Sequence, residues 1–380
     1  MTEMVFTNAR VVTRDREFAG SVVVRDGVIA RAEPGASAAA GATDLEGDYL
    51  VPGLVELHTD NLEKHFAPRP GVRWPGRAAV MAHDAQIAAA GITTVFDALA
   101  LGDVFYGSSR IEGLADMHAG ICRARDTGLL KADHHLHLRC ELSFAQVLEL
   151  FERLMDGELV RLVSIMDHTP GQRQFVDVAK YRLYYQKKYT MSDAEFEAFL
   201  ANRREAQAKY SVMHRRAILD RAKARGFVLA SHDDATLAHV TESADDGMSI
   251  AEFPTTLEAA RASRERGLAV LLGAPNVVLG GSQSGNIAAR DLAAEGLLDI
   301  VSSDYVPMSL MQAPFVLAQA GVGLDLPAAI RLASYNPARA MGLDDRGEIA
   351  PGQRADLARV RVVDEMPIVR SVWRGGARVV

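Results

Sequence analysis

Apolar runs of strand character alternate with helical patterns through the middle of the chain. Segment 78–90 is rich in alanine and stops at Gly91, and segment 257–266 stops at Gly267, as helices often do before a glycine. Strands that alternate with helices predict βα units and a parallel sheet. We count eight such runs, at residues 53–58, 92–98, 134–141, 160–167, 227–232, 248–254, 268–273 and 299–304.

Eight parallel strands are the number that closes a TIM barrel, so the pattern predicts an α/β fold of the (β/α)8 type. The alternative is an open doubly wound sheet. That fold usually carries a Gly-x-Gly-x-x-Gly turn after its first strand, and no such turn follows residues 53–58. The barrel is therefore the architecture that we expect.

The two ends of the chain differ from the middle. Residues 4–32 hold short alternating strands, with Asp26-Gly27 between two β-branched runs, and such a pair is typical of a tight hairpin. Residues 356–360 and 372–380 return to the same pattern. Because both ends are rich in strand signals, we expect them to pair in one small sheet that brings the termini together.

The composition is that of a soluble globular protein: 380 residues, 48% hydrophobic and 24% charged. The net charge of −7 argues against a general nucleic-acid binder. Cys122 and Cys140 are the only cysteines and form no Cys-x-x-Cys pair, which favours reduced thiols. No apolar stretch approaches the roughly 20 residues of a membrane span, and the first four residues lack the basic start of a signal peptide. We therefore expect a cytoplasmic protein that binds neither membranes nor nucleic acid.

Metal-binding side chains stand at the ends of the apolar runs. His58 and Asp60 close the first run and, as residues i and i+2 of a strand, point the same way. The C-terminal strand ends are where the chemistry of a barrel lies. Four further candidates end later runs in the same way: Glu141, His168, His232 and Asp304.

Imidazole and carboxylate ligands suit zinc, manganese or iron(II). Six such ligands exceed the usual four of one ion, so we expect two divalent ions per chain, with zinc as first choice. Glu141 is the carboxylate that we expect to bridge them, and a water held between two cations ionises near neutral pH. The alternative for each of the six residues is a buried, hydrogen-bonded core group.

A basic segment suits a polyanionic partner. Residues 161–226 contain 14 Lys or Arg and 7 Asp or Glu. Lysine and arginine side chains bind phosphate oxygens. The segment is either a lid over the barrel mouth or a solvated helical face. Three basic residues close in sequence to ligands favour substrate binding: Lys64, Arg69 and Arg173. For six others we expect a solvated helical face: Arg203, Arg204, Arg215, Arg216, Arg221 and Arg225.

Other polar features are weaker. His135, His137 and Arg139 alternate onto the face of Glu141, where we expect a polar network or support for ligands rather than direct metal binding. His83 lies on the alanine-rich helix and is interpreted as packing or capping. The glycine-rich stretch 280–286 is either a phosphate-binding loop or simply a loop.

The whole chain resembles the amidohydrolase superfamily. The resemblance rests on the strands at both ends, the two isolated histidines, the late aspartate, residues 50–53 (Leu-Val-Pro-Gly) and residues 347–357. It implies a TIM barrel at 54–345 that carries a small β-sandwich domain built from 1–53 and 346–380. It also implies one or two metals, and gives Asp304 the roles of ligand and general base.

The chain departs from the superfamily's commonest pattern. Asp60 stands where a second histidine is usual. No lysine is positioned to be carboxylated, so Glu141 must serve as the bridge. Our strand count also places His168 and His232 on the fourth and fifth runs, one earlier than is usual in the superfamily.

Within this superfamily, long runs are similar to the triphosphate diphosphatases of the carbon–phosphorus lyase pathway. This resemblance implies hydrolysis of α-D-ribose 1-methylphosphonate 5-triphosphate to the 5-phosphate and diphosphate, by attack on the α-phosphorus. The binding partner would be this small polyphosphorylated substrate. The sequence does not decide whether the chain forms a homo-oligomer. The runs are residues 58–65, 68–74, 83–86, 134–141 and 164–175.

Two other functions compete with this interpretation. A cyclic-amide hydrolase or deaminase would use the same metals to attack a carbonyl or amidine carbon. A neutral ring substrate would not need the positive charges of segment 161–226. A catalytically dead barrel that serves as a scaffold would have lost ligands, whereas all six are retained.

Overall fold

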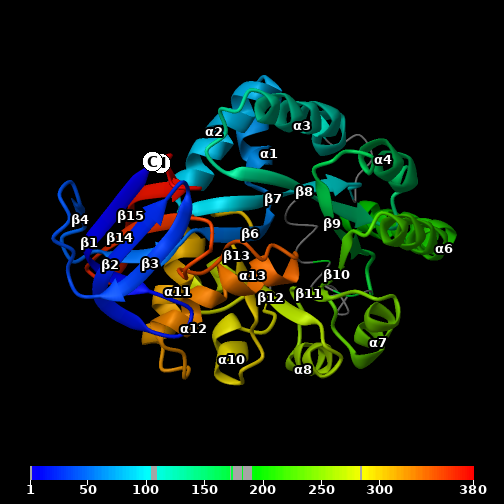
Figure 1. The fold of residues 1–380 in the computed structure, drawn as a ribbon. Coiled ribbons are helices and arrows are strands. Elements are labelled where there is room, and N and C mark those ends of the chain that lie inside the picture. Colours follow the sequence, from blue (N-terminus) through cyan, green and yellow to red (C-terminus); the bar gives the residue numbers. More distant parts are fainter. Residues whose placement is uncertain (1, 104–108, 172, 174–181, 183–190, 283–284) are drawn as a thin grey trace. The chain divides into compact units, whose positions relative to one another are not determined.

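Strands from both ends of the chain form one sheet in the computed structural model (Figure 1). The structure describes residues 2–103, 109–171, 173, 182, 191–282 and 285–380. The strand order is β16-β15-β14-β5-β1-β2-β3, and β4 pairs with β1. The antiparallel pairing of β14 with β5 joins the two ends, which confirms the predicted pairing. The strands are β1 (Glu3–Val12), β2 (Glu17–Arg25), β3 (Val28–Pro34), β4 (Thr43–Asp44), β5 (Tyr49–Pro52), β14 (Leu357–Val363), β15 (Met366–Arg374) and β16 (Ala377–Arg378).

Local chemistry explains this sheet. Asp26 and Gly27 have φ of +47° and +81°, the positive values that a two-residue hairpin requires, and they join β2 to β3 as predicted. Phe6 and Trp373, from opposite ends of the sequence, pack edge to face with ring centroids 4.7 Å apart. Their burial supplies hydrophobic free energy that neither end gains alone.

A second sheet holds eight parallel strands in sequence order and forms a nearly closed barrel (Figure 1). A parallel bridge between Thr59 and Asp304 joins the first strand to the residue two after the last one. This confirms the predicted (β/α)8 barrel with a separate sheet from both termini. The strands are β6 (Leu54–Thr59), β7 (Ile92–Leu101), β8 (Asp133–Glu141), β9 (Val160–Met166), β10 (Val228–His232), β11 (Ile250–Glu252), β12 (Ala269–Gly273) and β13 (Ile300–Ser302).

The helices agree with the sequence pattern where it was strongest. The predicted 78–90 and 257–266 correspond to α2 and α8, and α6 begins with a capping box between Ser192 and Glu195. The described helices are α1 (Asn61–Phe66), α2 (Gly76–Ala89), α3 (Ser109–Asp126), α4 (Val147–Leu154), α6 (Asp193–Ala224), α7 (Leu237–Asp245), α8 (Leu257–Glu265), α9 (Ala274–Leu279), α10 (Ala289–Ala294), α11 (Ser309–Gln319), α12 (Leu326–Arg331) and α13 (Tyr335–Ala340).

Contacts between residues divide the chain into two compact units. The first comprises Met1–Asp97, Ala119–His135 and Leu272–Val380, and the second comprises Ala98–His118 and Leu136–Leu271. The domain boundaries expected from the sequence, 1–53 with 346–380 against 54–345, stay a prediction. Among the described residues, no helix combines the length and the apolar character needed to cross a membrane.

Candidate metal centre

Three of the predicted ligands come together in the first unit. His58 lies near the end of β6, Asp60 follows that strand, and Asp304 follows β13. Each offers one ligand atom, and these atoms lie within 4.8 Å of one another. The backbone ties the two strand ends together, because Asp60 N–H donates to Asp304 O at 2.8 Å and Asp304 N–H donates to His58 O at 3.0 Å. We call these three residues the first donor group.

Glu56 holds the strands that carry this group. It is fully buried, and its two carboxylate oxygens accept the N–H groups of His58 (2.7 Å) and Ser303 (2.6 Å). Burial raises the pKa of Glu56 to about 7 in spite of these hydrogen bonds. Glu56 was not among the residues predicted for the site. The available signal was a glutamate inside the otherwise apolar strand 54–57.

Two further predicted ligands meet in the second unit, together with one residue that was not predicted. His232 ends β10, His168 lies two residues beyond β9, and Asp233 follows His232. Their ligand atoms also lie within 4.8 Å of one another. We call these three residues the second donor group. The signal for Asp233 was its position directly after a predicted ligand at a strand end.

The second donor group fits a divalent cation. Asp233 Oδ2 lies 3.4 Å from His232 Nε2 and 3.6 Å from His168 Nε2. This buried oxygen has no hydrogen-bond partner among the described residues. A buried carboxylate oxygen without a hydrogen bond is costly, and a cation shared with the two imidazoles would satisfy it. Imidazole with carboxylate is also the donor set that zinc and related ions prefer.

Glu141 orients His168. Its Oε2 lies 2.6 Å from His168 Nδ1, while Oε1 accepts hydrogen bonds from Ser143 Oγ (2.6 Å) and Arg203 Nη2 (3.1 Å). With Nδ1 held by a carboxylate, His168 presents Nε2 towards Asp233, as a histidine ligand does. No donor group found among the described residues includes Glu141, so its predicted bridging role stays a prediction.

Charges around His168 set its protonation. Burial raises the pKa of Glu141, but the nearby charge of His168 and the hydrogen bonds hold it at about 2. Burial lowers the pKa of His168, whereas the Glu141 and Asp233 carboxylates raise it to about 9. A cation that binds Nε2 must therefore displace a proton, so metal binding at this residue depends on pH.

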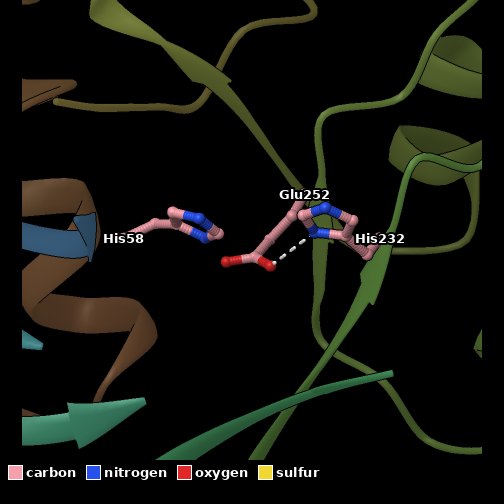
Figure 2. Close-up of side chains that lie close together, drawn as sticks. All are labelled: His58, His232 and Glu252. Carbon is pink, nitrogen blue, oxygen red and sulfur yellow. Dashed lines mark hydrogen bonds and ion pairs between the residues drawn. The ribbon is translucent and has the colours of Figure 1, made fainter. Parts of the chain in front are cut away.

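Glu252 plays the corresponding part for His232. Figure 2 shows the Glu252 carboxylate beside His232, with Oε2 lying 3.2 Å from Nδ1. His232 Nε2 is thereby directed towards Asp233. Glu252 is fully buried on β11 and also lies 3.8 Å from His137 Nε2. Figure 2 also draws His58, which belongs to the first donor group.

The three predicted substrate-binding residues differ in their surroundings. Lys64 is exposed on α1, where Nζ donates to Tyr305 O and lies 5.4 Å from the centroid of that ring. Arg69 is exposed in a short turn closed by the Val72 N–H. Arg173 is buried and forms ion pairs with Asp234 and with Glu242, the latter at 2.8 Å.

The expectation of a solvated face was wrong for Arg203. Its side chain is buried and pairs with Glu141. The spacing of the buried residues Phe196, Leu200 and Arg203 along α6 gives the reason, because residues i, i+4 and i+7 share one helical face. Arg215 is half-buried and pairs with Asp246 at 2.7 Å. The remaining four are exposed or half-buried: Arg204, Arg216, Arg221 and Arg225.

Other parts of the basic segment lie outside the described residues. This holds for 174–181 and 183–190, which contain three of its lysines and its cluster of tyrosines. The choice between a lid and a solvated face therefore stays open. Residues 283 and 284 of the glycine-rich stretch also lie outside the described residues, so a phosphate-binding loop there stays a prediction.

Comparisons with known proteins agree with this picture. The model of the amidohydrolase family matches residues 189–379. A relative from Escherichia coli (strain K12), α-D-ribose 1-methylphosphonate 5-triphosphate diphosphatase, is 49% identical over 99% of this chain and 100% of its own length. Imidazolonepropionase from Deinococcus deserti is 28% identical over 94% of this chain and 92% of its own length.

Solved structures share the fold. 5-Methylcytosine deaminase from Klebsiella pneumoniae superimposes with a TM-score of 0.67 at 15% identity, covering 99% of this chain and 97% of that one. N-acetyl-D-glucosamine-6-phosphate deacetylase from Mycobacterium smegmatis gives a TM-score of 0.64 at 20% identity, covering 99% and 100%. At this level of identity, the likeness concerns the fold alone.

Proposed function

Because the chain belongs to the amidohydrolase family, we propose that it is a metal-dependent hydrolase that converts α-D-ribose 1-methylphosphonate 5-triphosphate to the 5-phosphate and diphosphate. The full-length similarity to the Escherichia coli diphosphatase, at 49% identity, carries this proposal. The two donor groups support it, because each assembles histidine and carboxylate ligands at strand ends of the barrel.

Each donor group would hold one divalent ion, with zinc favoured over manganese or iron. Glu141 and Glu252 would orient the two histidines of the second group from their Nδ1 side. When bound, such ions polarise a phosphoryl oxygen and make a water molecule acidic enough to attack near neutral pH. Asp304 is the base that we propose for the proton of that water, because it is a half-buried carboxylate within a donor group.

Basic side chains would bind the phosphates. Lys64 and Arg69 lie four and nine residues beyond Asp60 and are both exposed, so their charges are available to a polyanion. Arg173 remains a proposed substrate-binding residue, although Asp234 and Glu242 already neutralise much of its charge. Charge on the departing diphosphate would be offset by such groups.

The test is to incubate the purified, metal-loaded protein with the ribose triphosphate and to follow the products by phosphorus NMR. We expect diphosphate and the 5-phosphate in equal amounts. Hydantoin and dihydrouracil, as neutral cyclic amides, serve as comparison substrates. Release of orthophosphate alone would contradict the proposed bond cleavage. Turnover of a cyclic amide without turnover of the triphosphate would favour the alternative hydrolase.

A further inference from the structure

Five buried polar side chains of the first unit have no role in the proposed reaction. Each has an exposed fraction of 4% or less, and buried groups of this kind need partners. They come from α1, α2, β7 and β8. We call them the buried network: Asn61, His83, Asp84, Asp97 and His134.

One end of the buried network is ionic. His134 Nδ1 lies 2.6 Å from Asp97 Oδ2, and its Nε2 lies 3.2 Å from Asp84 Oδ1. Because both ring nitrogens face carboxylates, both must donate, and His134 is an imidazolium. Burial lowers its pKa, but the charges and hydrogen bonds of the two aspartates raise it to about 10. Asp84 also accepts the backbone N–H groups of Lys131 and Ala132.

The other end reaches the helix that follows Asp60. His83 Nε2 lies 2.7 Å from Asp97 Oδ1, and His83 Nδ1 lies 3.0 Å from Asn61 Nδ2. The Asn61 amide is the donor to Nδ1, so the proton of His83 is on Nε2 and is donated to Asp97. Asn61 Nδ2 also donates to Gln86 Oε1 at 2.9 Å. Both protons of this amide are therefore used, and its orientation is set.

The buried network includes a group of metal-ligand type, His83, Asp97 and His134, but its geometry is that of hydrogen bonds. Each oxygen of Asp97 already accepts an N–H from a different imidazole. Both ring nitrogens of His134 and Nε2 of His83 carry protons, and His83 Nδ1 accepts from Asn61. No imidazole nitrogen of this group therefore offers a lone pair to a cation. A positioning role accounts for these contacts better than a third ion does.

Helix α1 needs such support. It has six residues, and Asp60, at its N-cap, makes no side-chain capping hydrogen bond. A helix this short is not stable by itself. Gln86 Oε1 accepts from Asn61 and also contacts His65 Nε2 at 2.8 Å, so both turns of α1 are tied to α2. Asn61 is the next residue after Asp60, so fixing Asn61 fixes the backbone that carries a proposed ligand.

We propose that the buried network positions Asp60 for metal binding, with Asn61 as the residue that makes the connection. The inference rests on the metal-dependent function proposed above. It predicts that Asn61 affects the affinity for the ion held by the first donor group. Asn61 is buried and its side chain contacts His83 and Gln86, so we assign it as a positioning residue.

The test is the zinc affinity of the full chain, measured by competition with a chelating indicator and without substrate. Asn61→Ala should weaken one of the zinc sites about ten- to a hundredfold, the effect that is usual when a residue supporting a ligand is lost. Excess zinc should restore kcat and leave KM unchanged. Because the measurement needs no substrate, it stands even if another substrate is hydrolysed.

Val80→Ala is the matched control, because Val80 is buried on α2 but takes no part in the buried network. It should lower the midpoint of thermal unfolding and leave zinc affinity unchanged. If Asn61→Ala does not fold, Gln86→Met removes one of the two acceptors and should give a smaller loss of affinity. Normal zinc affinity in the Asn61 or Gln86 variant, or an equal loss in Val80→Ala, would overturn the proposal.

Discussion

Asp304 combines a left-handed backbone with a place in the first donor group. Its φ is +53°, a region that aspartate enters only at some cost, and its backbone N–H and C=O bind the neighbouring strand end. We predict that Asp304→Asn retains most of the metal and loses turnover by about 10²- to 10⁴-fold, because an amide cannot accept the proton. Steady-state rates and elemental analysis check this, with the exposed Asp291→Asn as control. A near-normal rate would remove Asp304 from the mechanism.

Arg203 and Arg204 are adjacent in sequence and differ in burial, so they form a natural pair for mutation. Arg203 is buried against Glu141, whereas Arg204 is exposed. Removing one partner of a buried ion pair typically costs about 3–5 kcal/mol, so Arg203→Ala should lower the free energy of unfolding by that order. Arg204→Ala should change it by less than about 0.5 kcal/mol. Urea denaturation of the metal-free protein measures both, and similar values for the two variants would contradict the assignment.

Lys64 and Arg69 test the recognition of phosphate. A charge-assisted contact is worth roughly 1.5–3 kcal/mol, so Lys64→Ala and Arg69→Ala should each lower kcat/KM for the triphosphate by about ten- to a hundredfold. Arg225→Ala, an exposed change at the C-cap of α6, is the control and should have little effect. Unchanged kcat/KM in both test variants would mean that these side chains are simply solvated.

At the scale of elements, helix α2 and strands β7 and β8 are joined by an ion pair that titrates. The pKa of His134 is raised from 6.5 to about 10 in the folded chain. Its contribution to stability is therefore complete below about pH 6.5 and is lost as pH rises towards 10. At about 1.4 kcal/mol per pKa unit, the free energy of unfolding should fall by a few kcal/mol over this range.

Urea denaturation at a series of pH values checks this prediction. His134→Gln should be less stable than the unchanged protein at pH 6.5, and its stability should depend less on pH between 7 and 10. Groups such as tyrosine and lysine titrate equally in both proteins, so the difference between the two curves isolates His134. Parallel curves would contradict the prediction.

At the scale of the whole molecule, the first donor group lies in the first compact unit and the second donor group lies in the second unit. We therefore predict close to two transition-metal ions per chain in active protein, measured by elemental analysis after exhaustive desalting. A chelator should abolish turnover, and added zinc should restore it. The same treatment should lower the midpoint of thermal unfolding, because a ligand that binds only the folded state stabilises it. One ion or none in active protein would contradict this prediction.

Local sequence patterns were enough to predict the strands of the barrel and the residues at their ends. Short continuous apolar runs indicate strands that are buried on both faces, and the residue that follows such a run lies at the end of the strand. This is why the sequence places His58, Asp60 and Asp304 at strand ends as predicted ligands, and His168 and His232 at the fourth and fifth strands.

The pairing of buried charges, in contrast, depends on how the chain packs in three dimensions. Glu141 meets Arg203, which lies 62 residues away, and His134 meets Asp84, 50 residues away. Such partners depend on how helices pack on the barrel, and no local pattern encodes that packing. Asp233 could not be predicted for the same reason. A carboxylate next to a predicted ligand is common in sequences, and only the fold shows that His168 also faces it. Local periodicity specifies the helices and strands. Which buried charges pair depends on packing, because an unpaired charge is costly in the low dielectric of the protein interior.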